Sequence, residues 1–156
     1  PDEGGVCLTR GGWPFLVLNA GYLGSLLFGA LFLLLGARRR MAAPVVAAIG
    51  ALTLLATLFY VRGLFAFVYC LLLGLVFLLV ASRLPGEASE LLLAAIGAMS
   101  ALYAVADVVS DVIVRHAAAS DASQLAQVTG LPAVLWGVLW IAVSLATLAA
   151  VLRRLA

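Results

Sequence analysis

The chain has 156 residues, of which 66% are hydrophobic and 10% charged, and its mean hydropathy is +1.24. Soluble domains average about 45–50% apolar and about 25% charged residues. The composition therefore excludes an ordinary soluble protein and predicts an all-α integral membrane protein in the lipid bilayer. The net charge of +2, with the basic residues scattered at the ends of apolar runs, argues against nucleic-acid binding.

The first segment, residues 1–13, is Gly-rich and polar, and its short run "VCLT" has the pattern of an edge strand between turns. We expect it to be extramembrane or re-entrant. It has no basic region followed by an apolar core, so it does not resemble a signal peptide. Because the first methionine is Met41, we expect this chain to be the C-terminal part of a longer protein.

Five apolar runs follow, and each is close to the roughly 20 helical residues that cross a bilayer. Their approximate ranges are 14–36, 42–61, 64–82, 90–114 and 132–152. We expect one transmembrane domain over residues 1–156, with a bundle of about five helices in residues 14–152. A short surface helix over about 121–128, with Asp121 and Gln124 as a capping box, is expected between the last two runs.

Arginines near the ends of these runs set the expected orientation, because cytoplasmic loops carry more positive charge. Five spans put Arg38, Arg39, Arg40, Arg83, Arg153 and Arg154 on one side and Arg10, Arg62 and Arg115 on the other. The larger group predicts a cytoplasmic C-terminus for a multi-pass protein.

The first run, "LNAGYLGSLLFGA", carries small residues at helical spacing, which allow another helix to approach closely. Asn19, Gly21, Tyr22 and Gly24 lie on or beside this face. They are candidates either for helix packing with one interhelical hydrogen bond or for contact with a substrate strand.

Tryptophans in the last run, Trp136 and Trp140, fit the aromatic belt of a membrane interface. His116 is the only histidine in the chain and cannot by itself form a two-histidine metal site, so we interpret it as a solvated flanking residue.

The fourth run carries the strongest functional signal. Ser100, Tyr103, Asp107, Asp111 and Arg115 are spaced three or four residues apart and share one helical face. An ionisable residue inside a membrane span is a functional-site hypothesis by default. Asp111 can pair with Arg115 in the favourable order, which would make the pair structural. Neighbouring carboxylates repel unless a cation or shared proton lies between them, and a metal ion is one way to satisfy both.

Three blocks, "GGVCLTRGGWPFLVLNAGYLGSLLFGA", "ALYAVADVVSDVI" and "SDASQLAQVTGLPAVLWGVLWIAVS", together resemble the M50B-like branch of the site-2-protease membrane metallopeptidases. The resemblance implies an intramembrane zinc protease that cleaves a membrane-protein or peptide substrate. In such enzymes a transmembrane HExxH supplies two histidine ligands and a general-base glutamate, and a downstream aspartate is the third ligand. Asp107 and Asp111 are the candidates for that ligand here.

The chain lacks HExxH, since no glutamate lies between two histidines. By the resemblance, that motif and the general base are expected upstream of Pro1, in N-terminal helices that would partner this chain. We therefore predict that this chain alone contains no catalytic residue and is inactive. The alternatives are a non-catalytic membrane scaffold, or a proton or cation transport module that uses Asp107 and Asp111.

Overall fold

The structure is a computed structural model that describes residues 11–109 and 120–155. These residues form six α-helices and no strand. The helices are α1 (Pro14–Gly36), α2 (Arg39–Tyr60), α3 (Leu64–Arg83), α4 (Gly86–Val108), α5 (Asp121–Thr129) and α6 (Ala133–Leu155). The expected edge strand and the end of the fourth predicted run lie outside the described residues.

Five of the helices, all except α5, are long and apolar enough to cross a membrane. Their lengths of 20 to 23 residues match the thickness of the hydrocarbon layer. The prediction of an all-α protein with about five spans is confirmed, and the protein is a multi-pass integral membrane protein.

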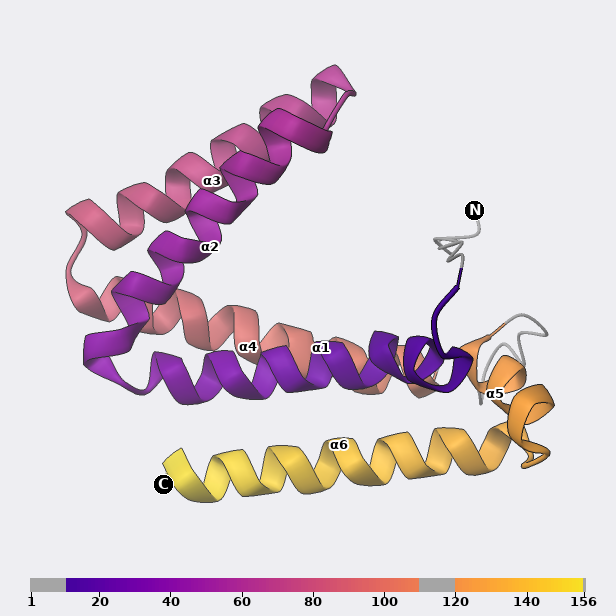
Figure 1. Cartoon of the computed structure of the whole chain (residues 1–156). Helices are drawn as coiled ribbons and strands as arrows, with labels where there is room; N and C mark the ends of the chain where they lie inside the picture. Colours follow the sequence, from indigo (N-terminus) through magenta and orange to yellow (C-terminus); the bar gives the residue numbers. More distant parts are fainter. Residues whose placement is uncertain (1–10, 110–119, 156) are drawn as a thin grey trace.

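The helices are arranged as a packed layer and a diverging hairpin (Figure 1). Helices α1, α4 and α6 run alongside one another, and the α2–α3 hairpin leaves them at an angle. The short helix α5 lies at the end of the layer where α1 begins and α6 starts. The C-terminus lies at the opposite end, on the same side as the α1–α2 connection.

Small residues bring α1 and α4 together. An ideal Cβ built on Gly29 would lie 2.8 Å from both the Gly97 carbonyl oxygen and the Ala101 backbone nitrogen. A side chain at Gly29 would therefore push the helices apart. Close backbone approach of this kind is the usual basis of helix association in lipid, where apolar burial gives little driving force.

The α2–α3 hairpin packs in a similar way through Gly50 and Gly74. A Cβ on Gly50 would lie 3.0 Å from the Gly74 carbonyl oxygen. Gly74 is the only buried residue of α3, so the other described helices leave most of the apolar surface of α3 uncovered.

A buried cluster of large side chains joins α1, α4, α5 and α6 at one end of the layer. Its members are Tyr22, Val108, Ala122, Leu125, Trp136 and Trp140. The tryptophans are only 8% and 1% exposed, so the interpretation of Trp136 and Trp140 as an aromatic belt is wrong. Their indole N–H groups explain the difference, because both find acceptors inside the protein. Trp140 Nε1 donates to Asn19 Oδ1 at 2.8 Å and Trp136 Nε1 donates to Thr129 Oγ1 at 3.1 Å.

Helix α5 is present as predicted, but its cap is one residue earlier. Ser120 is the N-cap, and its hydroxyl accepts a hydrogen bond from the Ser123 amide at 3.2 Å. Asp121 is therefore the first helical residue. Gly130 ends the helix in the left-handed region, with φ 76°, where glycine is favoured.

Candidate functional site

Asp107 lies in the last turn of α4, on the exposed side of that helix. The buried stripe of α4 runs through Ala101, Ala104 and Val108. Asp107 is one residue out of phase with Val108, which rotates it by about 100° around the helix. Asp107 therefore faces away from the stripe of α4 that packs against the described helices. The expectation that it points into a bundle that includes N-terminal helices stays a prediction from the sequence.

No hydrogen bond or ion pair reaches the Asp107 carboxylate from the described part of the chain. The acids at the other end of α4 differ in this respect. Arg39 lies 3.7 Å from Glu87 and 3.8 Å from Glu90, so both have a cationic neighbour. Asp107 is the second-to-last residue of the membrane-spanning helix α4. Its carboxylate has no cationic neighbour among the described residues, and an ionisable residue in a membrane span is a functional-site hypothesis.

Asp111, Arg115 and His116 lie outside the described residues. The shared face of Asp107 and Asp111, and the pairing of Asp111 with Arg115, remain predictions from the sequence.

The antiparallel packing of α1 against α4 shows what lies level with Asp107. Ser100 donates a hydrogen bond to the Ser25 carbonyl oxygen at 2.8 Å. An ideal Cβ on Gly29 lies 2.8 Å from both the Gly97 carbonyl oxygen and the Ala101 backbone nitrogen, so Gly29 is level with the stretch between these two residues. Gly21 lies eight residues before Gly29, and Asp107 lies eight residues after the middle of that stretch, which is the same rise along both helices. Gly21 and Asp107 thus lie at a similar height near the α1–α4 seam, and both are exposed.

Asp121 is an acid that the sequence analysis interpreted only as a helix cap. An ideal Cβ on Gly21 would lie 3.2 Å from Asp121 Oδ2, and no other atom comes within 4 Å of it. The absence of a side chain at Gly21 thus leaves the space in which the Asp121 carboxylate rests against α1. The "SDA" block that carried part of the family resemblance contained this residue, and was the signal that could have found it.

The other candidates in α1 divide into packing residues and open positions. Asn19 donates to the Phe15 carbonyl oxygen at 2.8 Å and accepts from Trp140. The Tyr22 ring lies 4.6 Å from the Trp140 ring, centroid to centroid. Asn19 and Tyr22 therefore hold α1 against α6, as the packing interpretation expected. Gly24 has nothing within 4 Å of an ideal Cβ and makes no close helix contact.

The described residues do not complete a metal site. Among them, no group of three His, Cys, Asp or Glu side chains is placed to hold an ion. A catalytic zinc site uses three protein ligands and an open position. The acidic residues described at this end of the bundle, Asp107 and Asp121, are carboxylates alone, and they do not form such a site by themselves.

The fold and this site define a multi-pass membrane protein with a carboxylate, Asp107, at one end of its bundle that has no partner within residues 11–109 and 120–155. The peptidase M50B-like family matches residues 1–151. The chain belongs to this family of membrane metallopeptidases, and the resemblance seen in its sequence is confirmed. No curated protein and no solved structure gave a significant match.

Proposed function

We propose that the chain is part of a zinc-dependent protease that cleaves peptide bonds within or near the bilayer. Asp107 supplies one carboxylate ligand, and a helix outside this sequence supplies the histidines and the general base. The observation that carries the proposal is the Asp107 carboxylate, exposed on a membrane-spanning helix without a partner among the described residues. Membership of a metallopeptidase family supports a metal as that partner.

Bound zinc would lower the pKa of its water to about 7 and polarise the scissile carbonyl. The role of this chain would be to hold the Asp107 carboxylate at a fixed position along α4, beside the contact between α1 and α4. The close contact at Gly29 and the Ser100–Ser25 hydrogen bond fix that position. Asp111, one turn further along, would orient the ligand or a water, as carboxylates beside metal ligands commonly do.

The test is cleavage of a membrane peptide by the full-length protein. Asp107→Ala should abolish zinc-dependent cleavage, because it removes a ligand. Asp111→Ala should reduce the rate by about 10–100-fold, which is the usual effect of a group that orients a metal ligand. Glu87→Gln is the matched control, because Glu87 is an exposed acid at the far end of the same helix. Wild-type cleavage by both aspartate variants would reject the metal-site proposal, and a wild-type protein without peptidase activity would favour a scaffold.

We also propose a cytoplasmic C-terminus. The two arginines of the last turn of α6 lie at the same end of the layer as the α1–α2 connection with its arginines (Figure 1). This clustering follows the positive-inside rule. Cysteine-labelling should find positions near Arg39 and Arg154 on one side of the membrane and position 116 on the other. Labelling of position 116 from the same side as position 154 would contradict the five-span topology.

A further inference from the structure

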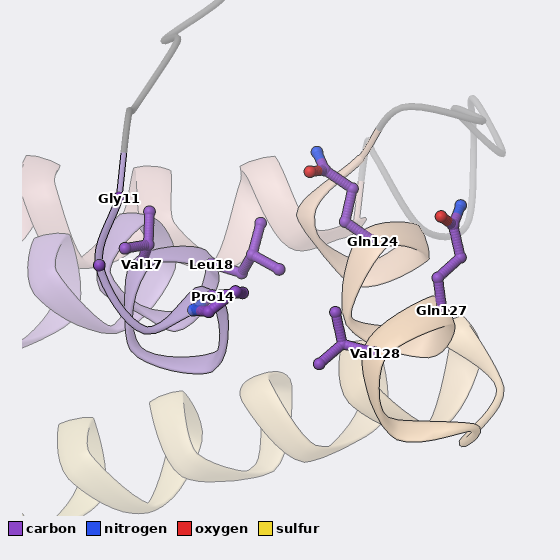
Figure 2. A pocket seen from close by; sticks show the side chains of 8 residues that line it. Gly11, Pro14, Val17, Leu18, Gln124, Gln127 and Val128 are labelled. Atoms are coloured by element: carbon purple, nitrogen blue, oxygen red, sulfur yellow. The ribbon is translucent and has the colours of Figure 1, made fainter.

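A cavity of about 410 Å³ opens between the start of α1 and the short helix α5 (Figure 2). Pro14, Val17 and Leu18 form its α1 wall, and Gln124, Gln127 and Val128 form its α5 wall. In Figure 2 the Val128 side chain points across the cavity towards α1. The cavity therefore combines an apolar interior with two side-chain amides from one face of α5.

The chain that leads into α1 contributes backbone rather than side chains to the cavity. Gly11 and Gly12 line it with φ of 80° and 95°, in the region that glycine alone adopts easily. Nothing lies within 4 Å of an ideal Cβ on Gly11. The peptide groups at this edge are thus open to a ligand.

The described lining is uncharged. Among residues 11–109 and 120–155, no charged side chain lines the cavity, whereas a phospholipid headgroup carries a phosphate that proteins usually bind with Arg or Lys. A glutamine amide offers two donors and one acceptor oxygen, which is the set that a peptide group needs. The chemistry of the lining therefore favours an uncharged peptide over a lipid headgroup.

The cavity lies close to the candidate site. Leu18 forms part of its wall and also packs against the buried cluster that contains Val108. Val108 is the residue after Asp107. A chain held in the cavity would thus lie at the same end of the bundle as the proposed metal ligand.

We propose that this cavity binds an extended, uncharged segment of the peptide substrate, and that Gln127 hydrogen-bonds to the backbone of that segment. The inference rests on the proposed protease function, because it takes the ligand of the cavity to be the substrate of that site. Gln127 and Val128 would then determine where along its length the substrate is held.

The experiment uses full-length protein in detergent and a fluorescent, end-capped octapeptide of Ala, Val and Ser as the probe, with binding measured by anisotropy. The wild type should bind it saturably. Gln127→Ala should weaken binding by about three- to tenfold, the effect of losing one or two neutral hydrogen bonds. Val128→Trp should abolish binding by filling the cavity. Val138→Trp, on the exposed face of α6, is the matched control and should bind like the wild type.

Two further arms separate the possible outcomes. An octapeptide with N-methylated backbone amides should bind more weakly than the unmodified one, because it cannot donate to Gln127. Asp107→Ala should keep peptide binding while it loses cleavage, so a failure of the metal proposal is visible separately. Absence of wild-type binding, or equal binding of the methylated peptide, would overturn the inference. So would a co-purified phospholipid that Val128→Trp removes while peptide binding stays unchanged.

Discussion

The two ends of the molecule are held together by different interactions. Where α1 meets α5 and α6, a large buried cluster is joined by side-chain hydrogen bonds from Trp140 to Asn19 and from Trp136 to Thr129. In the α2–α3 hairpin, the described residues form no side-chain hydrogen bond between the two helices. Thr53 and Thr57 instead donate to carbonyl oxygens of their own helix, at 2.8 and 2.7 Å.

This difference indicates that crossing the membrane and holding the helices in one defined arrangement depend on different interactions. Small residues and lipid contact are enough for a hairpin that only has to cross the bilayer. Directional hydrogen bonds and ring contacts fix helix positions more narrowly, and they gather around α1, α5 and α6. Val108, the neighbour of the candidate ligand Asp107, lies in that more tightly fixed region.

The largest effect on stability is expected when a glycine at a close contact between two helices is replaced by alanine. Gly29→Ala places a Cβ 2.8 Å from backbone atoms of α4, which can move only with the helix. Overpacking of this kind costs about 1–3 kcal/mol. Gly74→Ala meets Leu54 Cγ and Cδ2 at 2.7 Å and the Gly50 carbonyl oxygen at 3.1 Å. It should destabilise less than Gly29→Ala, because its closest contacts are with a side chain and its backbone contact is longer. Gly24→Ala, in open space, is the control for the added methyl group.

The measurement is the free energy of unfolding in detergent with increasing SDS. Equal destabilisation by Gly29→Ala and Gly74→Ala would show that the α1–α4 and α2–α3 contacts accommodate an added methyl group equally well, against this prediction.

A smaller effect is expected at the Asn19–Trp140 hydrogen bond. Asn19→Ala leaves the buried indole N–H without its acceptor, and Trp140→Phe removes the donor. A double-mutant cycle should give a coupling of about 0.6–1.7 kcal/mol, the range measured for hydrogen bonds between membrane helices. Leu75→Ala, on the exposed face of α3, should be nearly neutral and serves as the control. A coupling of zero would mean that the ring contacts alone hold α6 against α1.

Much of the fold could be predicted from local sequence. Hydropathy and length identified the five spans, and the range predicted for the first matches α1, Pro14–Gly36. Helix ends moved by a few residues elsewhere. For example, α4 begins at Gly86 rather than near Glu90, because Pro85 takes the cap position.

The site was harder to predict because it depends on contacts between distant segments. The sequence showed which residues share a helical face with Asp107. It did not show which face of α4 is covered by α1, because that depends on the contact of Gly29 with Gly97 and Ala101. That contact buries Ala101 and leaves Asp107 exposed. In the same way, the local sequence around Asp121 predicts only a helix cap. Its position beside Gly21 depends on the packing of α5 against α1. The burial of Trp140 likewise depends on Asn19, which is 121 residues away in the sequence.

The most direct test of the central claim is the zinc content of purified full-length protein. We predict stoichiometric zinc in the wild type and in Tyr103→Phe, which alters the same exposed face of α4 one turn away. Asp107→Ala should lose the metal while it still inserts and elutes as a folded protein. Wild-type zinc content in Asp107→Ala would contradict the account, because the exposed carboxylate would then have some other partner.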